Sequence, residues 1–148
     1  MKRLTTVTKF MIGLMLSGLM INTYGQDVKA YKEGPVIEVS YIKIKPGKFE
    51  DYMKFLDSNY KSVMEAQKKA GLILGYQVYS AQARSPREAD LILTITYPNM
   101  AALDKIAEAE AVTAKVMGNM DAQSKAAIGR EPMREVLGSE LLRELILK

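Results

Sequence analysis

Apolar and polar residues alternate over residues 36–45, VIEVSYIKIK, and the alternation stops at Pro46-Gly47. Alternation rich in β-branched and aromatic residues is typical of a strand. From about residue 47 to residue 70, apolar residues instead recur every three or four positions, as on one face of a helix. Phe49, Met53 and Leu56 begin this series. The pattern predicts a strand that passes into a helix at the Pro-Gly corner.

The middle of the chain predicts a strand pair and two more helices. Residues 72–82 (LILGYQVYSAQ) and 89–97 (ADLILTITY) have strand composition, and the loop between them is short enough for an antiparallel hairpin. Pro98-Asn99 then begins a helix whose apolar stripe continues to Met117. A short additional helix is expected over residues 121–128.

The end of the chain, residues 139–148, fits two periods. Leu141, Leu142 and Leu145 have helical spacing, whereas Leu141, Arg143 and Leu145 alternate. Local propensity favours a helix. A strand is preferred nevertheless, because the preceding β-α-β-β-α order lacks only a final strand to complete a split βαβ repeat.

These elements predict one α+β domain over residues 36–148. The expected fold is ferredoxin-like, βαββαβ with an extra short helix, in which helices cover one face of a four-stranded antiparallel sheet. Residues 26–35 are polar and without a period, and they are expected to form a leader into the domain. A chain of this length can bury a sufficient core without disulfides, and it contains no Cys.

The first 25 residues have the layout of a secretory signal peptide. Basic residues precede an uncharged apolar run over residues 10–21, and the small residues Thr23 and Gly25 follow at suitable positions. The run is shorter than the roughly 20 residues that a membrane span needs. We expect cleavage after Gly25 and a periplasmic or extracellular protein without a stable membrane span. An uncleaved N-terminal anchor is the alternative.

The charge of the chain argues against nucleic-acid binding. The sequence has 21 Lys and Arg against 17 Asp and Glu, but Lys2, Arg3 and Lys9 belong to the expected signal peptide. Without them the net charge is +1, with 18 basic and 17 acidic residues. No basic cluster with interleaved aromatic residues remains, so no nucleic-acid partner is expected.

Several kinds of chemistry are excluded by composition. The chain has neither His nor Cys, which removes Ser-His-Asp and Cys-His nucleophile systems and the usual zinc sites. Its glycines fit neither the dinucleotide fingerprint nor a P-loop. No metal and no cofactor are therefore expected.

Alternation divides the predicted hairpin into two unlike faces. One face is strongly apolar, with Leu91 and Leu93 among its residues, and the other mixes Ile92 with Gln77 and Thr94. Such a mixed face is too apolar for open water and too polar for a plain core. Two compatible explanations remain: it packs against the same face of a second subunit, or it lines a cavity with a few placed polar groups.

Glu38 is the candidate catalytic residue. It lies in the middle of a predicted strand, where Ser40 and Gln77 could share its face. Burial without a cation would favour its protonated form and suit it to general acid–base chemistry. The alternative is that Glu38 lies at a strand end in solvent, or pairs with Arg134 or Arg143.

Four residues are candidates for contact with a small hydrophobic or aromatic ligand: Ser40, Gln77, Tyr79 and Thr94. The predicted strands also carry several tyrosines, which combine apolar area with a hydrogen-bonding tip and suit a flat organic molecule. Ordinary core and interface tyrosines are the alternative.

Two stretches resemble the dimeric α/β-barrel superfamily: residues 42–52, IKIKPGKFEDY, and Gly71 followed by LILGYQVYS. This group includes small antibiotic-biosynthesis-type monooxygenases and uncharacterised exported domains. The resemblance covers roughly residues 36–147. It implies that two protomers pair their sheets into a barrel and that ligands lie inside each protomer. It does not imply one chemistry, and haem-degrading members usually rely on a His that this chain lacks.

The expected function is that of an exported homodimeric domain that binds a small molecule. One alternative is a cofactor-independent monooxygenase or isomerase, with Tyr side chains and Glu38 as its polar groups. Another alternative is a purely structural assembly module whose interior is filled by side chains.

Overall fold

The computed structural model describes residues 29–148, so the signal peptide expected over residues 1–25 lies outside the described residues. In chain order the elements are β1 (Tyr31–Ile44), α1 (Phe49–Phe55), the π-helical turn η1 (Leu56–Tyr60), α2 (Lys61–Lys69), β2 (Gly75–Ser80), β3 (Leu91–Tyr97), the 3-10 helix η2 (Met100–Asp104), α3 (Ile106–Met117), α4 (Met120–Arg130) and β4 (Arg134–Leu147). No helix within this part of the chain is both long and apolar enough to cross a bilayer.

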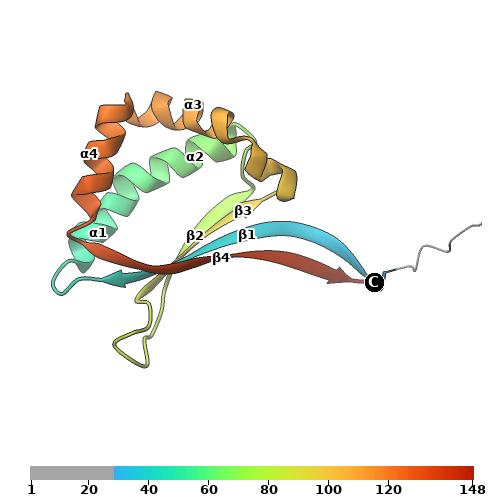
Figure 1. Ribbon diagram of the computed structural model, residues 1–148, viewed down its shortest axis with the longest axis horizontal. Coiled ribbons are helices and arrows are strands. Elements are labelled where there is room, and N and C mark those ends of the chain that lie inside the picture. Colours follow the sequence, from blue (N-terminus) through green and yellow to red (C-terminus); the bar gives the residue numbers. More distant parts are fainter. Residues whose placement is uncertain (1–28) are drawn as a thin grey trace, which may run out of the picture.

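The four strands form one antiparallel sheet in the order β2-β3-β1-β4. All helices lie on one side of it (Figure 1). The expected ferredoxin-like α+β fold is therefore confirmed, including the extra helix α4 before the last strand. The end of the chain forms strand β4, as the order of the elements predicted. Local propensity alone favoured a helix there.

Strand β1 begins earlier than the sequence predicted, inside the supposed leader. Tyr31 pairs with Leu147, and the Glu33 carboxylate lies 3.1 Å from the Arg143 guanidinium of β4. Residues 31–35 are polar, so their sequence does not predict a strand. They form one because they pair with β4, which lies far away in the sequence, and not because they bury an apolar face. Strand β2 differs in the opposite sense, since it begins only at Gly75.

Two glycines allow the sharp corners at the ends of the first helical segment. Gly47 follows β1 with φ +73°, and Gly71 follows α2 with the same φ. Residues other than glycine rarely adopt this left-handed backbone conformation. The Pro46-Gly47 signal thus marks a true strand-to-helix corner.

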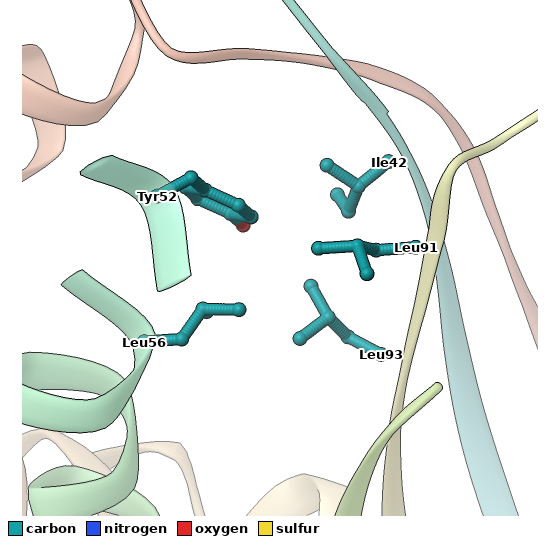
Figure 2. Close-up of a cluster of buried hydrophobic side chains, with 5 residues drawn as sticks. All are labelled: Ile42, Tyr52, Leu56, Leu91 and Leu93. Carbon is teal, nitrogen blue, oxygen red and sulfur yellow. The ribbon is translucent and has the colours of Figure 1, made fainter. Parts of the chain in front are cut away.

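The core lies between α1–α2 and the inner strands. Figure 2 shows Tyr52 and Leu56 pointing from the helical layer toward Ile42, Leu91 and Leu93 of the sheet. A second buried cluster joins α2 to the segment before β2 and consists of Val63, Met64, Leu72 and Ile73.

The strand register decides which side chains face the helices. Glu38 of β1 pairs with Ile95 of β3, which in turn pairs with Tyr76 of β2, so all three lie on the helix-covered face. Val39 pairs with Thr94 on the opposite, uncovered face. The predicted division of the hairpin into an apolar and a mixed face is confirmed.

We expect Leu91→Ala to lower the free energy of unfolding by about 3 kcal/mol, because it removes a fully buried side chain and leaves a cavity. The matched control is Ile128→Ala on α4, whose side chain is 64% exposed. This control should change stability by less than about 0.5 kcal/mol. Urea unfolding measures both, and equal effects would contradict this placement of the core.

Candidate functional site

Three adjoining hollows lie on the helix-covered side of the sheet. The largest, about 500 Å³, lies between the α1–η1–α2 segment and α3–α4. The second, about 400 Å³, lies between α3 and the ends of the strands. The smallest, about 150 Å³, reaches the sheet itself. Tyr60 and Arg130 line both the first and the third, and Glu38 lines the second and third. The hollows therefore meet around these residues, in a volume suited to a small organic molecule.

The π-helical turn η1 places Tyr60 at this meeting point. Its wider turn interrupts an otherwise α-helical segment, and the Ser58 hydroxyl donates to the Lys54 carbonyl oxygen at 2.8 Å within the same stretch. Single π-turns inside α-helices are frequent at functional sites. The sequence predicted one continuous helix here, because a single extra residue in a turn leaves almost no trace in the hydrophobic period.

The Tyr60 hydroxyl is buried without a hydrogen-bond partner in the described part of the chain. The Tyr60 ring packs edge-to-face against Tyr76, with 5.8 Å between ring centres. Burial raises the pKa of Tyr60 well above its usual value, and the nearby Tyr52 and Glu38 raise it further. The group is therefore a neutral phenol with an unused proton. A buried polar group in this condition costs stability and is available to a ligand.

Glu38 lies in the middle of β1 and is partly buried. Its carboxylate accepts a hydrogen bond from the Tyr97 hydroxyl at 3.0 Å. Burial, together with this carboxylate, raises the pKa of Tyr97, so Tyr97 remains the donor. Neither alternative for Glu38 is observed, because it is not at a strand end and forms no ion pair within residues 29–148. Arg143 pairs with Glu33 instead. A catalytic role for Glu38 stays a prediction.

Two arginines complete the polar wall of the smallest hollow. Arg130 ends α4 and Arg134 begins β4, and both are partly buried. The Arg134 guanidinium lies 5.7 Å from the centre of the Tyr52 ring. Burial lowers the pKa of Arg130, and the positive charge of Arg134 lowers it further. Arg130 is not among the site residues that the sequence predicts, because only folding brings the end of α4 close to the π-turn.

The predicted ligand-binding residues fall on both faces of the sheet. Ser40 lies beside Glu38 and lines the smallest hollow. Gln77 and Thr94 are on the uncovered face, where the Thr94 hydroxyl donates to the Gln77 side-chain oxygen at 2.9 Å. Tyr79 is on that face as well and is exposed. One protomer therefore cannot bring Glu38 and the four predicted ligand-binding residues to a single cavity.

The physical reason is the strand period of two. Glu38 pairs with Ile95 rather than with Thr94, and a shift of one residue in register moves a side chain to the other face. The sequence shows the alternation within each strand but not the register between strands. Across residues 29–148, no cluster of three or more potential metal-ligating side chains occurs.

We expect the variants Tyr60→Phe and Tyr97→Phe to change stability in opposite directions. Tyr60→Phe removes an unpaired buried hydroxyl and should raise the free energy of unfolding by about 1 kcal/mol. Tyr97→Phe removes a hydrogen bond to a carboxylate and should lower it by about 2 kcal/mol. Urea unfolding of both variants provides the measurement, and destabilisation by Tyr60→Phe would show that its hydroxyl has a partner.

Comparisons with known proteins identify the fold. No protein-family model and no curated protein matches this sequence. Among solved structures, a Shewanella oneidensis protein is 15% identical with a TM-score of 0.50, and the match covers 78% of this chain and 98% of that one. A dimeric ferredoxin-like protein from an uncultured marine organism is 9% identical with a TM-score of 0.49, covering 79% and 90% of the two chains.

A further similar structure is a candidate antibiotic biosynthesis monooxygenase from Chloroflexus aurantiacus. It is 15% identical with a TM-score of 0.42, and the match covers 74% of this chain and 92% of that one. These two neighbours are described as a dimeric ferredoxin-like protein and as a monooxygenase. The likeness of this chain to them is one of fold.

Proposed function

We propose that this protein is an exported homodimer that binds a small hydrophobic or aromatic molecule between its sheet and its helices. The observation that carries the proposal is the buried Tyr60 hydroxyl, which has no partner among the described residues and lies where the hollows meet. A buried phenol hydroxyl without a partner lowers the stability of the folded protein unless another group accepts a hydrogen bond from it. A bound ligand is the natural acceptor.

The walls of the largest hollow support an apolar occupant. Phe55, Met64, Met117 and Ala127 contribute to its lining. Methionine side chains are flexible and polarisable, and they adapt to ligands of varied shape. A hollow of about 500 Å³ also argues against the structural-module alternative, which requires an interior filled by side chains.

The uncovered face of the sheet supports a homodimer. It carries Ile37, Ile92 and Tyr79 beside polar side chains, and no helix covers it (Figure 1). Leu142 of β4 adds to this face, since it pairs with Ile37 and is exposed. Burial of such a surface against a second copy would remove apolar area from water.

Export rests on the sequence alone. The basic, apolar and small-residue segments of residues 1–25 have the order of a signal peptide. Strand β1 begins at Tyr31, after the expected cleavage site. Removal of the signal would therefore leave every described strand and helix intact.

Native mass spectrometry of protein from the exported fraction tests the proposal directly. We expect a dimer of chains that begin at Gln26 and carry an additional small mass. The variant Ala127→Phe, which fills the largest hollow, should lose that mass. The control Ala111→Phe, on the exposed side of α3, should retain it. A wild-type dimer without added mass would argue against ligand binding, and chains that begin at Met1 would argue against cleavage.

The interface is tested by two neighbouring leucines with almost equal exposure. Leu142 is 44% exposed on the uncovered face, and Leu141 is 45% exposed on the helix side. We expect Leu142→Glu to yield monomers because it buries a charge in the interface, whereas Leu141→Glu should remain dimeric. Light scattering coupled to size-exclusion chromatography gives the mass. Dimers of Leu142→Glu would place the interface elsewhere.

A further inference from the structure

We propose that the ligand is an organic acid with an apolar body, and that Arg130 binds its carboxylate with Tyr60 as a second donor. This inference rests on the proposed function and specifies the chemical class of the ligand. It follows from where unpartnered hydrogen-bond donors gather and where apolar walls surround the remaining space.

The first observation is a pair of positive charges that face the same small hollow. Arg130 and Arg134 both line the hollow of about 150 Å³. Neither forms an ion pair with another residue in the described range 29–148, although several exposed lysines there do, such as Lys61 with Asp57 at 2.9 Å. Two partly buried guanidinium groups repel each other when no anion lies between them. An anionic group of a ligand would relieve this repulsion.

The second observation distinguishes the two arginines. Arg134 lies against the ring of Tyr52, which already gives its guanidinium a favourable contact. Arg130 has no such partner among the described residues, and it lines both the smallest and the largest hollow. Its planar guanidinium presents a fork of donors that matches a carboxylate in two parallel hydrogen bonds. Arg130 is therefore the principal anion-binding residue.

The third observation is that Tyr60 stands at the same boundary. It lines the same two hollows as Arg130, and its buried hydroxyl has a proton to donate. Arginine has only donors, and the high pKa of Tyr60 keeps this phenol protonated. Groups of this kind select a ligand atom that accepts hydrogen bonds. A carboxylate oxygen satisfies both of them.

The position of Glu38 orients the ligand. Glu38 lines the smallest hollow on the sheet side, where its carboxylate is held by Tyr97. A ligand carboxylate would be repelled from that end and attracted toward Arg130. The apolar body then extends into the largest hollow, past Phe55 and Met117. Arg130 is the only Lys or Arg that lines the largest hollow. A second acidic group on the ligand would therefore find no cation there, so a monoacid is favoured over a diacid.

The test compares two probes of nearly the same shape, the anionic 2-naphthoate and the neutral 2-naphthamide, by isothermal titration calorimetry at pH 7 with the cleaved protein. We expect wild-type protein to bind 2-naphthoate about tenfold more tightly, as a charge-assisted pair of hydrogen bonds allows. Arg130→Gln should remove this preference while affinity for 2-naphthamide changes less than about twofold. Arg130→Lys, which keeps the charge but loses the fork, should retain part of the preference.

Two further variants separate the site from general electrostatics. Lys125→Gln removes the same charge from an exposed position of α4 outside the hollows, and it should keep the full preference. Tyr60→Phe should weaken 2-naphthoate binding about threefold even though it stabilises the free protein. Unfolding midpoints of all variants confirm that they are folded. If Arg130→Gln does not fold, Arg130→Lys and Tyr60→Phe still carry the comparison.

The outcomes distinguish this inference from the proposed function. Equal binding of both probes by wild-type protein, or an undiminished preference in Arg130→Gln, overturns the acid-binding inference and leaves small-molecule binding standing. Loss of the preference in Lys125→Gln also overturns it, because the effect would then be one of net charge. Failure of both probes to bind overturns the inference and the proposed binding function together.

Discussion

The structure depends on the central position of β1, which is hydrogen-bonded to β3 on one side and to β4 on the other. Both partners lie far away in the sequence, so the sheet forms only when the two ends of the domain meet. Ile42 then points into the core against Leu91, while Glu38, four residues earlier on the same face, points into the hollow. One strand thus supplies both the base of the core and the acidic wall of the candidate site.

Stability and function are divided along the helical layer. The segment α1–η1–α2 packs tightly through Tyr52 and Leu56, whereas α3 and α4 contain no fully buried side chain. The less tightly packed helices α3 and α4 leave space for the largest hollow. The turn η1 places Tyr60 beside this hollow, and its hydroxyl has no hydrogen-bond partner among the described residues. Such a group lowers the stability of the free protein. A purely structural domain would be more stable with phenylalanine in place of Tyr60. The proposed ligand would restore the lost stability by accepting a hydrogen bond from the Tyr60 hydroxyl.

The predicted site illustrates how far a sequence can lead. The sequence predicts a shared face for Glu38 and Ser40, because residues two apart on a strand share a face, and both side chains line the smallest hollow. Gln77 and Thr94 were grouped with them, and the structure places these two on the opposite face. The sequence around Arg130 does not distinguish it from a surface arginine, so only the structure identifies it as a residue of the site. Export and homodimerisation stay proposals that rest on the N-terminal pattern and on the uncovered sheet.

The sequence by itself determined the order and type of the elements, because hydrophobic period and Pro-Gly punctuation are local properties of the chain. It also determined what chemistry is excluded, through the absence of His and Cys. Only the tertiary structure decided the strand register, the early start of β1 at Tyr31, and the meeting of Tyr60 with Arg130. These features depend on contacts between residues distant in sequence, and each is fixed by packing and hydrogen bonds that no local pattern records.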